Sequence, residues 1–100
     1  MQIRFHRLAL SEYRLAINRY RRQDNDLAIR FIHAVEYAAT RIGDDPRIGT
    51  TCYEDFLWLR VKKFKYLLYY RQLSDSLIMI YAVAHGSRRP GYWLRRARRI

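Results

Sequence analysis

The side chains best suited to chemistry gather near the end of the chain, in residues 85–93. Guanidinium groups there could clamp an anion such as phosphate, an imidazole or a phenol could move a proton, and aromatic rings could stack on bases. Each also has a plainer interpretation, since the histidine could be a hydrogen-bonded cap and the rings could pack the chain end onto a core. The set consists of His85, Arg88, Arg89, Tyr92 and Trp93. Glycines and a proline between them bend the backbone, so we expect a functional loop here.

A second basic group lies earlier in the chain and comprises Arg60, Lys62 and Lys63. Apolar side chains in residues 56–63 alternate with Trp58, Arg60 and Lys62, which predicts a strand with one apolar face and one basic, aromatic face. The basic face could simply be solvated, or it could receive an acidic partner. The second interpretation is favoured by the charge of the whole chain.

That charge points to an anionic partner. The chain holds 20 Lys and Arg against 9 Asp and Glu, a formal net charge of +11. Residues 1–50 carry 9 basic against 6 acidic side chains (+3), and residues 51–100 carry 11 against 3 (+8), so the second half dominates the field. Residues 94–100 form an Arg-rich tail, for which phosphate contact and disorder are both open.

Length and cysteine content limit the class of protein. One hundred residues predict a single domain over residues 1–100 with a thin core. Cys52 is the only cysteine, which excludes an internal disulfide and a Cys-rich zinc site, and we expect no metal and no cofactor. The first ten residues lack the apolar core of a signal peptide, and the longest apolar run is too short to span a membrane. A cytoplasmic protein without a membrane anchor is therefore expected.

Hydrophobic periodicity predicts the elements that position these side chains. Residues 77–84 are an unbroken apolar run, typical of a central strand buried on both faces. Residues 2–6 alternate as a short strand, and residues 8–22 repeat apolar side chains at helical spacing. A second helix follows from about Leu27 to Ile42, with Gly43 predicted as the left-handed residue after its end and Pro46 beyond.

The remaining strands complete an α+β domain. Residues 66–71 predict a strand paired with residues 56–63 through a tight link at Phe64 and Lys65, and residues 72–76 turn the chain into the central strand. Four strands and a helical hairpin give the order β-α-α-β-β-β, with the hairpin packed on one face of a small, mainly antiparallel sheet. The other face is expected to be open and positively charged.

This pattern resembles the RelE/ParE toxins of type II toxin-antitoxin systems. The resemblance covers nearly the whole chain and rests on the element order, the hairpin of residues 60–71 and the ending AVAHGSRRPGYWLRR. Residues 82–93 look like the ending of plasmid stabilisation proteins in this superfamily. In the first helix the matching set is Ala9, Glu12, Ala16 and Tyr20. The ParE-branch turn Arg-Phe-Pro-Tyr is matched by Lys63, Phe64 and Tyr66, whereas Lys65 replaces its proline.

The resemblance implies a small cytoplasmic toxin held inactive by an antitoxin whose extended or helical segment wraps its surface. In the ParE branch the target is DNA gyrase, and in the RelE branch it is messenger RNA in the ribosomal A site. RNA cleavage through its own 2′-OH needs a base, an acid and cations for the phosphorane charge. Candidates for these roles are Arg60, Lys62, His85, Arg88 and Tyr92. However, Tyr66 stands where the nuclease branch carries an arginine.

We therefore predict a ParE-like toxin that binds gyrase without chemistry of its own, with a RelE-like ribosome-dependent mRNA endoribonuclease as the alternative. A plain nucleic-acid-binding module is a third class, although no helix-turn-helix, zinc-finger, KH or RNP signature is present. The docking surface for target and antitoxin is predicted to comprise Arg60, Lys62, Lys63, His85, Arg88, Arg89, Tyr92 and Trp93.

Overall fold

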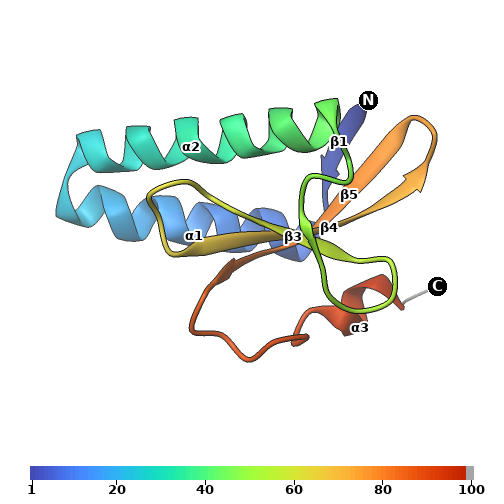
Figure 1. The fold of residues 1–100 in the computed structure, drawn as a ribbon. Coiled ribbons are helices and arrows are strands. Elements are labelled where there is room, and N and C mark those ends of the chain that lie inside the picture. The colour runs from blue at the N-terminus through green and yellow to red at the C-terminus, as the bar shows by residue number, and fades with distance from the viewer. Residues whose placement is uncertain (99–100) are drawn as a thin grey trace.

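A computed structural model describes residues 1–98, so Arg99 of the predicted basic tail and Ile100 lie outside the described residues. The helical hairpin lies along one face of the sheet, and the C-terminal segment lies along the other (Figure 1). The elements are β1 (Gln2–Phe5), α1 (Arg7–Gln23), α2 (Asn25–Asp44), β2 (Thr50–Thr51), β3 (Leu57–Arg60), β4 (Tyr66–Ser74), β5 (Leu77–His85) and α3 (Leu94–Ala97). The predicted α+β class and helical hairpin are confirmed.

The sheet has five strands in the order β1-β5-β4-β3-β2, not the four expected. The additional strand, β2, has two residues and pairs antiparallel with β3, and it is too short to leave a periodic signal in the sequence. β1 pairs parallel to β5, and the other pairs are antiparallel. β5 is an interior strand as predicted, although β4 is the middle strand of the five.

A single residue, Asp24, joins the two helices. Its backbone N–H donates to the Tyr20 carbonyl and closes α1, while its side chain accepts from the Asp26 N–H and begins α2. The expected left-handed residue at Gly43 is wrong, because α2 continues through it and ends at Asp44. Gly43 needs no left-handed backbone, and a Cβ there would make only an ordinary contact, 3.6 Å from the Met1 carbonyl oxygen.

The turn between β3 and β4 is longer than the predicted two-residue link. β3 ends at Arg60 and β4 begins at Tyr66, so residues 61–65 form the turn, with Lys63 at a φ of 70°. Phe64 in this turn packs into the core, with its ring centroid 5.1 Å from that of Phe31. Burial of this ring folds the turn toward the helices and leaves Lys62 and Lys63 exposed beside it.

The face opposite the helices is covered, and the expectation of an open, positively charged face is wrong. Residues after β5 fold back beneath the sheet (Figure 1) and bring Trp93 against the rings of Phe56 and Tyr69. Trp93 is 0% exposed. Aromatic side chains on this sheet face can be buried only if another apolar layer covers them, and the C-terminal segment supplies that layer. The sheet therefore has two cores, one on each face.

Candidate functional site

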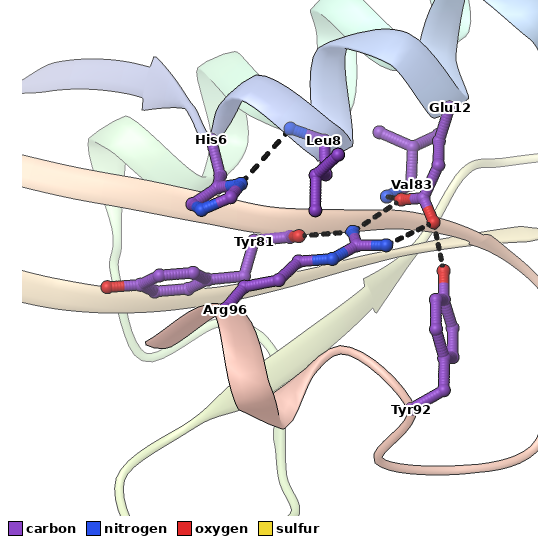
Figure 2. A network of polar contacts seen from close by, with 7 residues as sticks. All are labelled: His6, Leu8, Glu12, Tyr81, Val83, Tyr92 and Arg96. Carbon is purple, nitrogen blue, oxygen red and sulfur yellow. Dashed lines mark hydrogen bonds and ion pairs between the residues drawn. The ribbon is translucent and has the colours of Figure 1, made fainter. Parts of the chain in front are cut away.

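A side-chain network completes the edge of β5 where its parallel neighbour stops. β1 pairs with β5 only as far as Phe5 and Ile80, so the backbone of β5 beyond Ile80 has no strand on that side. A bulge lies here, because Tyr69 pairs with Ala82 while Tyr70 pairs with Ile80, leaving Tyr81 unpaired. Two long side chains, Glu12 of α1 and Arg96 of α3, reach this edge from opposite sides (Figure 2).

Each of these side chains satisfies one backbone group. A carboxylate oxygen of Glu12 accepts the Val83 N–H at 3.0 Å, and Arg96 donates to the Tyr81 carbonyl at 2.8 Å. Unpaired backbone groups at a buried edge would be costly, so the pair acts as a substitute for the missing strand. We call the set Glu12, Tyr92 and Arg96 the latch.

In the latch, Arg96 and Glu12 form a bidentate ion pair, and Tyr92 supplies a third hydrogen-bond donor. Arg96 donates to both carboxylate oxygens of Glu12, each at 2.9 Å, which is the planar arrangement that favours arginine over lysine. The Tyr92 hydroxyl donates to Oε2 of the same carboxylate at 2.6 Å. The side chains of Arg96 and Glu12 are only 13% and 15% exposed. The latch therefore ties the C-terminal segment to α1 and to β5 (Figure 2).

Two pKa values are changed by this arrangement. Burial by itself would raise the pKa of Glu12, but hydrogen bonds from Arg96, Tyr92 and the Val83 N–H outweigh it, so the pKa is lowered. Burial, followed by the hydrogen bond to Glu12, raises the pKa of Tyr92 well above its ordinary value. Tyr92 therefore serves as a hydrogen-bond donor to the carboxylate, a role different from the proton transfer for which it is a candidate in the nuclease interpretation.

The lowered pKa of Glu12 predicts a loss of stability in acid. A carboxyl group whose pKa is lower in the folded state stabilises that state at pH values above its unfolded pKa of 4.5. This contribution to stability is lost as the pH falls through the folded pKa. Urea unfolding from pH 7 to pH 3 should show this decrease. The decrease should be smaller in Glu12→Gln and unchanged in Glu36→Gln, whose side chain is exposed. Equal pH profiles for all three proteins would contradict the prediction.

His85, at the end of β5, lies between two pockets. The α1 pocket has a volume of about 300 Å³ and extends from His85 to α1, and the sheet pocket has a volume of about 510 Å³ and extends from His85 to β3. Nδ1 of His85 accepts the Ser87 N–H at 3.1 Å, so the interpretation of His85 as a cap of the turn is confirmed. The residues shared by both pockets are His85 and Ser87.

Exposed basic side chains line these two pockets and a third one. Arg60 lines the sheet pocket and also a third pocket beside Tyr37, to which Lys62 and Lys63 contribute. We call these exposed cations the basic rim: Arg19, Arg60, Lys62, Lys63, Lys65 and Arg88. Within residues 1–98 none of them forms an ion pair, because the two ion pairs there are Arg71 with Asp55 and Arg96 with Glu12. Arg89 is exposed in the same loop as Arg88.

The structure does not bring the five nuclease candidates to one pocket. Arg60 and His85 line the sheet pocket, Arg88 lines the α1 pocket, and Lys62 lies on the side toward α2. Tyr92 is absent from the linings of both the α1 pocket and the sheet pocket, and its hydroxyl is directed at Glu12 (Figure 2). The placement of Trp93 on the docking surface is wrong, because its side chain is fully buried in the second core.

Sequence reasoning missed the roles of Glu12 and Arg96. For Arg96 it left open phosphate contact or disorder, and the structure shows an internal ion pair instead. A signal was present, because Glu12 lies three residues after Ala9 and four before Ala16, both fully buried, and so belongs to the apolar stripe of α1. A carboxylate in that stripe needs a cationic partner, although the sequence does not say which of 20 cations it is.

Residues 1–98 contain no cluster of three or more His, Cys, Asp or Glu side chains placed to hold a metal ion. In the same residues, none of the helices combines the length and the hydropathy needed to cross a bilayer.

Residues 3–90 match the family model described as the ParE toxin of the type II toxin-antitoxin system, parDE. The matched range contains both long helices, the strands β2 to β5 and all of β1 except its first residue, and it ends before Tyr92, Trp93 and Arg96. A search of curated proteins gives no match.

Proposed function

The chain belongs to the ParE toxin family of type II toxin-antitoxin systems, and from this premise we propose that it inhibits growth by binding DNA gyrase through the basic rim. As a toxin of such a system it has an antitoxin as its partner. Binding would trap the DNA-cleaved state of gyrase, and the cognate antitoxin would prevent that binding. With gyrase as its target, the toxin would act in the cytoplasm.

The observation that carries this proposal is the dispersion of the candidate catalytic groups around an exposed, uncompensated basic surface. Cleavage of RNA requires the proton acceptor, the proton donor and the phosphate clamp to reach one substrate together. Lys62 and His85 line different pockets, and the Tyr92 hydroxyl is occupied by Glu12. A surface for binding has no such requirement, and a rim of unpaired cations speeds association with an acidic protein or a nucleoprotein.

The proposal is tested with purified toxin, DNA gyrase and a plasmid, assayed for supercoiling and for trapped linear DNA. A ribosome-bound mRNA cleavage assay is run with the same preparation. We expect lost supercoiling or accumulated linear DNA, and intact mRNA. Codon-phased cuts in the mRNA with unaffected gyrase would overturn the proposal in favour of the RelE-like endoribonuclease.

Charge reversal on the rim should reduce this activity strongly. Arg60→Glu/Lys62→Glu removes two cations and adds two anions on the rim, so we expect at least tenfold more toxin to be needed for half-inhibition of gyrase. The matched control is Arg4→Glu/Arg14→Glu, which makes the same change in net charge at exposed positions that line none of the pockets described above. Equal losses in both variants would mean that net charge alone acts, without a docking surface.

A further inference from the structure

The α1 pocket brings cations from two distant parts of the chain to one opening. Arg19 comes from α1 and Arg88 from the loop after β5, and His85 lies in the same lining. The only carboxylate of the lining, Glu12, is already engaged by both terminal nitrogens of Arg96 and by Tyr92. Its charge is compensated, so the field at the opening is that of the two arginines.

Each of the two arginines is positioned by a contact with a tyrosine side chain. Nη1 of Arg19 donates to the Tyr66 hydroxyl at 3.0 Å, and the guanidinium of Arg88 stacks 3.9 Å from the centre of the Tyr92 ring. A guanidinium has five N–H donors, so these contacts leave several of them on each arginine for a ligand. Groups positioned before binding lose less entropy when an anion arrives.

The rest of the pocket is suited to an aliphatic neighbour and not to a nucleobase. Leu15, with 65% of its surface exposed, lines the opening together with Ala16. Tyr66 is 4% exposed, and the half-buried His85 ring packs edge-to-face against it at 5.3 Å. The Tyr92 ring, outside the lining, has Arg88 at 3.9 Å and Arg96 at 5.2 Å from its centre, so the pocket has no open pair of stacked aromatic platforms. Recognition of single-stranded nucleic acid usually depends on such platforms. An anion attached to a peptide therefore fits this pocket better than a nucleotide.

We propose that the α1 pocket binds the carboxylate of an Asp or Glu side chain in a protein partner, with an apolar residue next to it packed on Leu15. The carboxylate lies between Arg19 and Arg88 and accepts hydrogen bonds from both. We assign this segment to the antitoxin, because a protein that must hold a toxin of net charge +11 gains most from an acidic anchor in a preformed cationic pocket. The assignment rests on the proposed function only in naming the antitoxin as the source of the segment.

The experiment is an NMR titration of isotope-labelled toxin with the dipeptide N-acetyl-Leu-Glu-amide, observed at the arginine Nε–H signals. The matched probe is N-acetyl-Leu-Gln-amide, which has the same shape without the charge. We expect saturable shifts at Arg19 and Arg88 with the glutamate peptide and at least fivefold weaker binding of the glutamine peptide. Arg19→Gln and Arg88→Gln should each weaken binding at least fivefold, and Arg14→Gln, an exposed position on the same helix, should change it less than twofold.

Three outcomes would overturn the inference. Equal binding of the two dipeptides would mean that the carboxylate is not recognised, and uniform shifts at all arginines would mean that the peptide only screens charge. Tighter binding of the dinucleotide UpU at the same arginines would assign the pocket to nucleic acid. Because Arg88 is exposed, Arg88→Gln should fold even if Arg19→Gln does not. None of these results depends on gyrase, so failure here is distinguishable from failure of the gyrase assay.

Discussion

Replacing Glu12 with alanine is expected to lower the free energy of unfolding by about 3 to 5 kcal/mol, because it leaves the largely buried guanidinium of Arg96 without its counter-charge. The same change removes the acceptor of the Val83 N–H and of the Tyr92 hydroxyl. Urea unfolding followed by far-UV circular dichroism measures the loss. Hydrogen exchange should locate the loosened region in the segment after β5, since the latch is what ties that segment to α1.

The control for this variant is Glu36→Ala, an exposed carboxylate on α2, which should change the free energy of unfolding by no more than about 0.5 kcal/mol. A double-mutant cycle with Arg96→Ala separates the ion pair from general damage. The Glu12→Ala/Arg96→Ala double variant should cost about 2 kcal/mol less than the sum of the two single variants, because neither charge is then left alone. Additive effects would show that the latch does not act as a unit.

Replacing Trp93 with alanine is expected to cost about 3 to 5 kcal/mol, since the indole is 0% exposed and its removal opens a cavity in the second core. Its ring centroid lies 4.8 Å from that of Tyr69 and 5.0 Å from that of Phe56, so their contacts are lost together. Urea unfolding measures this cost as well. A docking residue on the surface would instead leave stability nearly unchanged and lower only binding.

Trp93→Phe provides the comparison for this position. Within residues 1–98 the buried indole Nε1 has no hydrogen-bond partner, so phenylalanine loses contact area but also removes an unsatisfied donor. We expect a cost of about 1 kcal/mol, well below that of alanine. A phenylalanine variant as unstable as the alanine variant would show that the N–H is satisfied in solution or that the indole shape is indispensable.

Glu12→Ala and Trp93→Ala both loosen the C-terminal segment after β5, and the position of this segment determines which surface is free for binding. Because Trp93 and the latch hold this segment beneath the sheet, the aromatic sheet face is unavailable to a partner. Loosening the segment should therefore also move Arg88, whose guanidinium rests on Tyr92. This coupling makes the C-terminal segment a scaffold for the proposed binding surfaces.

The sequence by itself determined the helical hairpin, the interior strand β5 and the basic, aromatic character of the loop after it. These features depend on local periodicity and composition, as when the buried alanines of α1, Ala9 and Ala16, recur at helical spacing. The hydrogen-bonded cap at His85, one of the two interpretations that the sequence allows, is also a local feature, because its partner Ser87 is two residues away. Likewise, the net positive charge of the loop required no knowledge of the fold.

Only the tertiary structure decided where the C-terminal segment packs and which cations form no ion pair within residues 1–98. Glu12 and Arg96 are 84 residues apart, and nothing in the local pattern of either selects the other. The early end of β1 leaves the unpaired edge that the latch completes, and the bulge at Tyr81 lies in the pairing of β5 with β4 beside it; both depend on register between strands. The sequence cannot tell whether a tryptophan such as Trp93 binds a ligand or packs in the core. Its burial distinguishes these roles, and that burial comes from packing between distant segments.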